Sequence, residues 1–152
     1  MATLSGGIVV ATMPLLRGKE IAVMIEKAEI DLALCDERLA AEMEIAKAHA
    51  PQLKRICYFN GSGQIAAGAE LESLMEKYGA PFPACDTARD DVVLIAFTSG
   101  TTGKPKGVLL HHHALLTVAN ASALEMNMRP HSRMLHMMPL THSAPLNVFL
   151  LG

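Results

Sequence analysis

The residue types best suited to chemistry lie together in residues 98–107, which read TSGTTGKPKG. Three glycines let the backbone turn tightly and bring its N–H groups close to an anion. Four hydroxyl side chains supply short hydrogen-bond donors for phosphate oxygens, and two lysines supply the opposite charge. Pro105 stiffens the segment between the lysines, which lowers the entropic cost of holding them in place. This composition predicts a loop that binds phosphate groups.

The spacing within this loop excludes the Walker A pattern. That pattern requires four residues between its glycines and a Ser or Thr directly after its lysine. Here two residues separate Gly100 from Gly103, and Pro105 follows Lys104. We therefore do not expect a magnesium ion held by a Ser or Thr at that place.

The distribution of charge supports an anion site at the loop. Up to Asp91 the chain has 14 acidic and 9 basic residues, whereas from Val92 onward it has four basic residues and one acidic residue, Glu125. Between residues 92 and 124 the only formal charges are Lys104 and Lys106. Isolated positive charge in a loop rich in glycine and hydroxyl groups attracts anions, although two chance lysines in a solvated loop would look the same.

The overall composition excludes several classes of protein. Of 152 residues, 51% are hydrophobic and 18% are charged, which excludes a disordered chain. The net charge is −2, with two Tyr, four Phe and no Trp, so neither a polycation nor a base-stacking surface for nucleic acid is expected. No stretch of 18 apolar residues is present, so no membrane-spanning helix is expected. Three widely spaced cysteines without a CxxC pair indicate reduced thiols and a cytoplasmic protein.

The elements that must position the loop alternate between strands and helices. Short runs rich in β-branched residues predict strands, and 3.6-residue periodicity predicts helices between them. The predicted strands are 6–13, 31–36, 55–60, 91–97, 107–110 and 133–139; the predicted helices are 16–30, 38–50, 64–79 and 113–126. This order predicts an α/β fold with a mostly parallel sheet and helices on both faces. We expect a single α/β region over 1–152, made of a βαβ-rich segment 1–80, a proline-containing linker 81–90 and a phosphate-loop segment 91–152.

Residues 97–108, FTSGTTGKPKGV, closely resemble the phosphate-binding loop of the adenylate-forming (AMP-binding) superfamily. That superfamily includes acyl-CoA synthetases, luciferases and the adenylation domains of peptide synthetases. Residues 6–36 resemble the segment before this loop in aryl-CoA ligases of the benzoate and 2-aminobenzoate type. Residues 134–146, MLHMMPLTHSAPL, resemble the segment that follows it. The flanking segments are far less specific than the loop.

The resemblance implies a role for each loop residue and a reaction for the parent enzyme. The residues implied to bind ATP are Thr98, Ser99, Gly100, Thr101, Thr102, Gly103, Lys104, Lys106 and Gly107. Lys106 would also stabilise the charge that develops on the leaving pyrophosphate, and His142 would lie beside the ATP and acyl pockets. The parent would convert a carboxylic acid and ATP into an acyl-adenylate and then, with CoA, into an acyl-CoA. The substrates implied are ATP, CoA and an aryl or fatty acid, with Mg²⁺ as cofactor.

The resemblance also indicates what this chain lacks. Magnesium prefers carboxylates, but Glu125 is the only acid after the loop, and Asp90 and Asp91 begin the strand, at its far end from the loop. The later acidic segments and the C-terminal catalytic lysine of the family have no counterpart here. We therefore expect an interior fragment of the N-terminal domain, inactive alone and prone to self-association through exposed apolar surface. The alternatives are a non-catalytic module that binds nucleotide or polyphosphate, and a structural remnant without a ligand.

Two other patterns have a chemical interpretation that we do not favour. His111–His113 suggest a metal site, but consecutive residues do not converge on one ion, and no Cys or acid stands near them in the sequence. Residues 61–66, GSGQIA, fit the looser dinucleotide fingerprint, with Asp86 twenty residues beyond Ala66. Pro81 and Pro83 interrupt the place where the next strand of that fold should run, so a surface turn explains GSGQIA better. No metal ligands are assigned.

Overall fold

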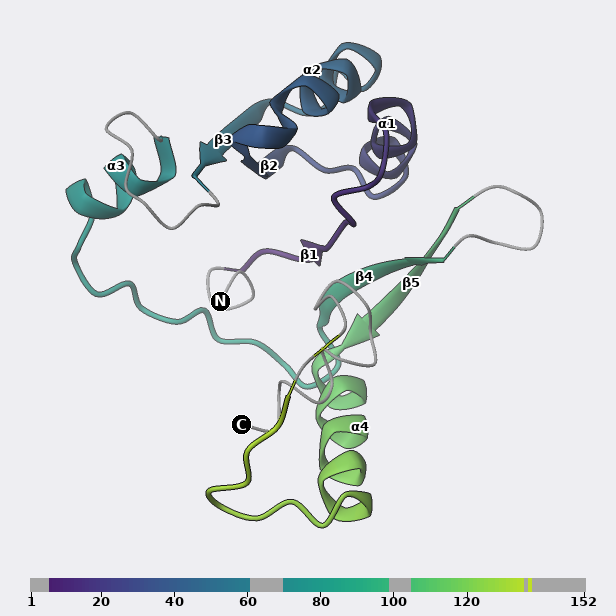
Figure 1. The fold of residues 1–152 in the computed structure, drawn as a ribbon, viewed down its shortest axis with the longest axis vertical. Helices are drawn as coiled ribbons and strands as arrows, with labels where there is room; N and C mark the ends of the chain where they lie inside the picture. Colours follow the sequence, from purple (N-terminus) through teal and green to yellow (C-terminus); the bar gives the residue numbers. More distant parts are fainter. Residues whose placement is uncertain (1–5, 61–69, 99–104, 136, 138–152) are drawn as a thin grey trace. The chain divides into compact units, whose positions relative to one another are not determined.

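The structure is a computed structural model that describes residues 6–60, 70–98, 105–135 and 137 (Figure 1). Its elements, in chain order, are β1 (Val9–Val10), α1 (Gly18–Lys27), β2 (Leu32–Asp36), the 3₁₀ turn η2 (Glu37–Leu39), α2 (Ala40–His49), β3 (Arg55–Phe59), α3 (Glu70–Lys77), β4 (Val92–Thr98), β5 (Lys106–His111) and α4 (His112–Glu125). The alternation of strands and helices confirms the predicted α/β class.

The chain divides into two compact units, and each is described by itself. One unit comprises Thr12–Phe82 and Phe97–Gly107; the other comprises Met1–Ala11, Pro83–Ala96 and Val108–Gly152. Residues 81–88 contain neither helix nor strand.

The first unit is built around the parallel pair β2–β3, on which α1 and α2 pack. Leu32 stands opposite Arg55 and Asp36 opposite Phe59, so the two strands are in register over their full length. Eight buried residues of this unit form one hydrophobic cluster: Ile21, Ala22, Ile25, Cys35, Ala46, Ala50, Leu53 and Ile56. Ile21 and Ile25 lie four residues apart on the buried face of α1, which agrees with the helical periodicity predicted for residues 16–30.

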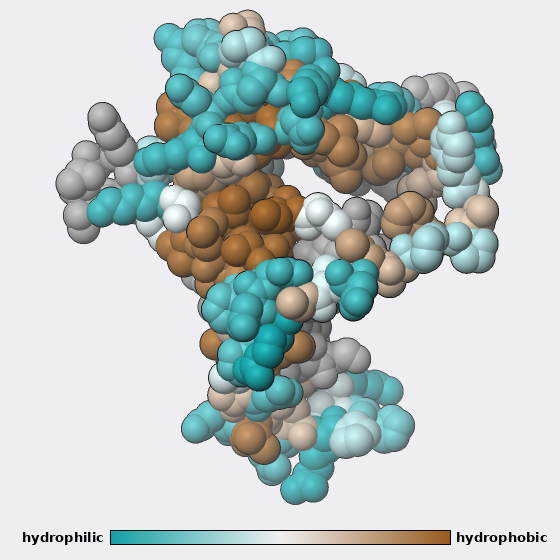
Figure 2. All heavy atoms as spheres, turned by 180° about the vertical axis from the view of Figure 1, so that it is seen from behind, coloured by the Kyte–Doolittle hydropathy of each residue, from teal (hydrophilic) through white to brown (hydrophobic). Residues whose placement is uncertain are grey.

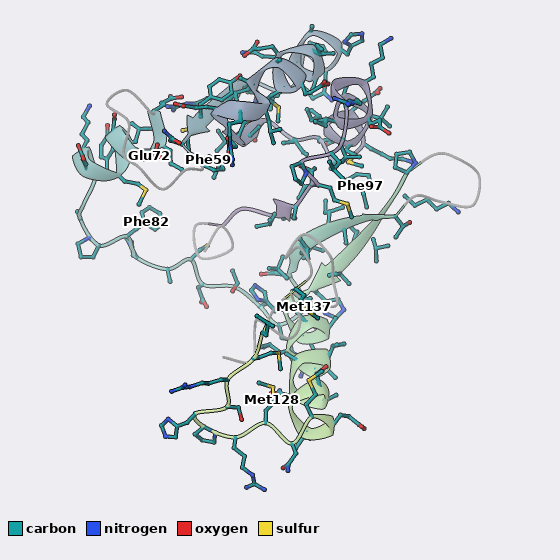
Figure 3. All side chains as sticks on the ribbon, viewed as in Figure 1. Phe59, Glu72, Phe82, Phe97, Met128 and Met137 are labelled. Carbon is teal, nitrogen blue, oxygen red and sulfur yellow. The ribbon has the colours of Figure 1, made fainter. Side chains whose placement is uncertain are left out.

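The carboxyl end of β3 is held by a side chain from α3. Glu72 accepts a hydrogen bond from the backbone N–H of Asn60 at 2.9 Å. Figure 3 shows Glu72 on α3 close to Phe59, the last residue of β3. The chain that precedes α3, residues 61–69, includes the GSGQIA pattern and lies outside the described residues.

The sheet that carries the predicted loop has the order β1–β4–β5. β1 is parallel to β4, with Val9 opposite Leu94 and Val10 opposite Ile95. β5 follows β4 after only a short connection, which is too short for a parallel crossover, so the two strands form an antiparallel hairpin. The strands of the described residues therefore form two small sheets, where the sequence predicted one mostly parallel sheet.

Two predicted strands differ from the structure. The first was predicted over residues 6–13 but is only Val9–Val10, where β4 offers pairing partners. The strand predicted over 133–139 is wrong for its described part, because residues 133–135 and 137 lie outside helices and strands. A strand is stabilised by its neighbours, and none of the strand pairs of the described residues includes this run.

Candidate functional site

The phosphate loop predicted from the sequence follows β4, a strand whose first six residues are all apolar. β4 reads VVLIAFT, with Leu94 buried, and its last residue is Thr98. Continuous β-branched and apolar residues favour a strand covered on both sides. Because the ligands of open α/β sheets bind beyond the carboxyl ends of parallel strands, Thr98 stands where such a ligand would be expected.

The two described ends of the loop are joined to each other. The Thr98 hydroxyl donates to the backbone carbonyl of Lys106 over 3.5 Å, at the upper limit for a hydrogen bond. Thr98, Lys106 and Gly107 are exposed. Both Thr98 and Lys106 are thus open to a ligand from solvent, and the structure brings these two predicted residues together.

The remaining predicted site residues lie outside the described residues. They are Ser99, Gly100, Thr101, Thr102, Gly103, Lys104 and His142. Their roles stay predictions that rest on the sequence.

A residue with no recognisable motif around it in the sequence contacts the loop. Lys27, the last residue of α1, donates a hydrogen bond from Nζ to the backbone carbonyl of Pro105 at 2.8 Å. The two residues are 78 positions apart in the chain. No local pattern could have predicted this contact, because it depends on how α1 packs within its unit.

The acidic residues near β4 lie at its other end. Asp91 stands directly before β4, and its Oδ2 accepts a hydrogen bond from the N–H of Ala88 at 2.8 Å. Thr98, the first residue of the loop, stands seven positions after Asp91, which corresponds to about 23 Å at the usual rise of a strand. This agrees with the expectation that these acids begin the strand at its far end from the loop.

The histidine triplet has a structural role at the start of α4. His111 Nδ1 accepts a hydrogen bond from the backbone N–H of Ala114 at 3.2 Å and so caps the helix. His113 Nδ1 lies 3.4 Å from the Thr117 hydroxyl, and the rings of His111 and His113 stack with centroids 6.3 Å apart. Among the described residues no group of three potential metal ligands is close enough to hold an ion. N-cap preferences favour Ser, Thr, Asp and Asn, so a histidine cap gives little signal in a sequence.

A pocket of about 620 Å³ lies in the unit of Thr12–Phe82 and Phe97–Gly107, but its charged groups are already paired. Arg38 donates to both carboxylate oxygens of Asp36 at 2.9 and 2.7 Å, and these bonds lower the pKa of Asp36 to about 2. Glu42 accepts from the backbone N–H of Gly18, which lowers the pKa of Glu42. These two carboxylates are therefore poor proton donors or acceptors near neutral pH, and the pocket is a weak candidate for acid–base catalysis.

The comparisons with known proteins agree on one family. The sequence matches the AMP-binding enzyme family over residues 2–152. An uncharacterized acyl-CoA ligase from Bacillus subtilis, YtcI, is 35% identical over 109 residues, which are 71% of this chain and 20% of that protein.

Solved structures share the fold of the chain at low sequence identity. ATP-bound MatB from Rhodopseudomonas palustris superposes on 97% of this chain with a TM-score of 0.82 and 23% identity. The inhibitor-bound N-terminal domain of FACL13 from Mycobacterium tuberculosis superposes on 99% of it with a TM-score of 0.84 and 24% identity. The chain spans 28% of that MatB chain and 36% of that FACL13 chain.

Proposed function

This chain belongs to the AMP-binding enzyme family, and on that premise we propose that it supplies the ATP phosphate-binding loop of an acyl-CoA ligase. One observation carries the proposal: the sequence TSGTTGKPKG begins at Thr98, the last residue of β4. The chain that contains it matches the family over residues 2–152. The likeness to the acyl-CoA ligase from Bacillus subtilis supports the choice of reaction.

In the proposed reaction a carboxylate attacks the α-phosphorus of ATP, the bond to the β-phosphate oxygen breaks, and pyrophosphate leaves. The acyl-adenylate then transfers its acyl group to the thiol of CoA and releases AMP. Lys106 holds the β- and γ-phosphates and stabilises the negative charge that develops on pyrophosphate. The hydroxyls of Ser99, Thr101 and Thr102 donate to phosphate oxygens. Thr98 lines the site, while its single hydroxyl proton bonds the carbonyl of Lys106. His142 lies beside the ATP and acyl groups.

The groups that bind magnesium are proposed to lie elsewhere in a longer protein. The described ends of the loop, Thr98 and residues 105–107, carry hydroxyl, carbonyl and ammonium groups and no carboxylate. These groups do not fit a magnesium site, because that ion is usually bound through carboxylates and water. Since the chain spans 20% of the Bacillus relative, we also propose that this chain alone completes neither half-reaction.

The proposed acyl substrate is an aryl or a fatty acid, and the resemblance of residues 6–36 to aryl-CoA ligases of the benzoate and 2-aminobenzoate type favours the aryl acid. A cytoplasmic location is proposed from the cysteines, since Cys35, Cys57 and Cys85 are all unpaired. Among the described residues no helix is long and apolar enough to cross a membrane.

Calorimetric titration of the chain with ATP and with pyrophosphate tests the binding proposal. We expect weak binding that decreases as salt rises, because exposed charges are screened over about 8 Å at physiological ionic strength. Lys106→Ala should lower the affinity about tenfold, since it removes a charged hydrogen-bond donor, and Lys104→Ala should lower it less. Glu125→Gln, at the far end of α4, is the control. If the two lysine variants lost affinity equally, the loop would attract anions only as a general positive patch. If the chain bound neither ATP nor pyrophosphate, the result would favour a structural remnant without a ligand.

A second assay separates binding from catalysis. The purified chain should form no acyl-hydroxamate from benzoate or fatty acids with ATP, Mg²⁺ and hydroxylamine. Turnover above a heat-inactivated sample would show that the chain is sufficient for adenylation.

A further inference from the structure

We propose that Lys27 is a positioning residue for the phosphate-binding loop, which it holds through the backbone carbonyl of Pro105. The inference rests on the proposed function, because it assigns a purpose to a residue outside the loop. Lys27 Nζ donates to that carbonyl at 2.8 Å across 78 residues of sequence. The contact lies within the unit of Thr12–Phe82 and Phe97–Gly107.

The contact fixes the one backbone torsion of Pro105 that remains free. The proline ring already limits φ to about −65°, so ψ decides where the carbonyl of Pro105 points. The ψ torsion of Pro105 also sets the orientation of the peptide plane shared with Lys106, and therefore the direction of the Lys106 N–H. A hydrogen bond from Lys27 to the carbonyl holds this plane in one orientation.

A second contact restrains Lys106 on its other side. The Thr98 hydroxyl donates to the carbonyl of Lys106 at 3.5 Å. Lys27 thus holds the carbonyl that precedes Lys106, and the carbonyl of Lys106 itself accepts a longer, weaker hydrogen bond from Thr98. An exposed lysine that must meet a phosphate loses less entropy on binding when its backbone is fixed in advance.

The bonding of Lys27 is consistent with this role. None of the ion pairs between described residues includes Lys27, so its described polar contact is the carbonyl of Pro105. The ammonium group also sits in the last turn of α1, where a positive charge interacts favourably with the helix dipole. That dipole interaction would stabilise α1 alone, whereas the bond to Pro105 acts on the loop.

The test compares four forms of the chain: wild type, Lys27→Met, Lys27→Arg and Lys19→Met. Lys27→Met removes the donor and keeps most of the apolar stem. Lys27→Arg restores a charged donor, and Lys19→Met is the matched control because Lys19 is an exposed lysine in the first turn of the same helix. Thermal unfolding followed by circular dichroism establishes that each variant is folded.

The first readout needs no ligand. In ¹⁵N-resolved hydrogen exchange, Lys27→Met should increase the exchange rates of the Lys106 and Gly107 amides several-fold, whereas Lys27→Arg and Lys19→Met should match wild type. If Lys27→Met does not fold, Lys27→Gln, which keeps a shorter neutral donor, replaces it and should show an intermediate increase. Unchanged exchange at Lys106 and Gly107 in a folded variant would overturn the proposal.

The second readout is affinity for inorganic pyrophosphate. Lys27→Met should weaken binding about three- to tenfold, the usual range for one lost hydrogen bond, and Lys27→Arg should restore it. The loss should persist in 0.5 M salt, because a positioning effect does not depend on screened attraction between Lys27 and the ligand. If the loss of pyrophosphate affinity disappeared at high salt, Lys27 would act by general electrostatic attraction, which would contradict a positioning role. If wild type binds no pyrophosphate, the proposed function fails, and the exchange rates still decide the role of Lys27.

Discussion

The backbone N–H of Gly18 donates a hydrogen bond to Glu42 Oε2 at 2.7 Å, which joins the first residue of α1 to α2. The N–H groups of a first helical turn have no partner inside the helix, so a carboxylate from a neighbouring helix stabilises this end. Arg17 adds a second contact, with its Nη1 3.2 Å from Glu42 Oε1. Glu42 therefore fixes where α1 meets α2.

Gly18→Ala should destabilise the chain because the two helices leave no room for a side chain. A Cβ at Gly18 would lie 2.6 Å from the carbonyl oxygen of Glu42 and 2.6 Å from Ile45 Cβ. Overpacking of this kind costs about 1–3 kcal/mol. The free energy of unfolding, measured in urea, should fall by that amount. Gly79→Ala is the matched control, since a Cβ added there would have no other atom within 4 Å, and an equal loss there would contradict the steric explanation.

Asp36 should make stability depend on pH in the acidic range. Hydrogen bonds from Arg38 lower the pKa of Asp36 from 3.8 to about 2 in the folded chain. A group whose pKa is lowered by folding stabilises the fold above its unfolded pKa, so this contribution is present above about pH 4 and is lost between pH 4 and pH 2. Asp36→Asn should flatten the decrease of the urea midpoint over that interval. Asp90→Asn, at an exposed pair 4.0 Å from Arg89, should leave the decrease intact.

The cap on α4 gives a prediction for the histidine triplet. His111→Ala removes the acceptor for the Ala114 N–H and should destabilise α4 by about 1 kcal/mol, as for other N-cap losses. His111→Asn places a favoured cap residue there and should restore the stability. Thermal unfolding followed by far-ultraviolet circular dichroism measures both. If His111→Asn and His111→Ala were equally destabilised, the role of His111 would be packing against His113 rather than capping.

The sequence predicted the elements better than their pairing. Hydrophobic periodicity is a local property, and it located β2, β3, β4 and the helices between them. Strand pairing depends on contacts between distant residues, and the division into the β1–β4–β5 and β2–β3 sheets has no local signal. The strand predicted over 133–139, which is wrong for its described part, shows how far composition alone can predict a strand. A short apolar segment has the composition of a strand whether or not a partner strand is present.

The sequence predicted which residues form the candidate site, but only part of how they are arranged. Glycines, hydroxyls and lysines in a row indicated the phosphate loop, because each type has a distinct role toward an anion. The contact from Lys27 to Pro105 could not be predicted, since it crosses 78 residues. The capping role of His111 was also missed, because histidine is not among the residues that usually begin a helix.

β5 leaves apolar side chains exposed beside an open strand edge. Val108 is 43% exposed and Leu109 is 61% exposed. In the sheet order β1–β4–β5, β5 is an edge strand of the described residues. Figure 2 shows hydrophobic residues gathered at the surface of the described parts of the chain.

The chain should therefore self-associate in solution, with β5 as one contact. Unpaired N–H and C=O groups on an edge strand pair readily with a second copy, and exposed apolar side chains add to the attraction. Light scattering over a range of concentrations should give an average mass above the 16.3 kDa of one chain. Leu109→Lys should shift the mass toward the monomer, because a lysine on an edge strand opposes pairing. Leu15→Lys, at a residue 86% exposed outside any strand, is the control and should change the mass little. A single monomeric species at every concentration would contradict self-association, and equal effects of the two variants would exclude β5 as the contact.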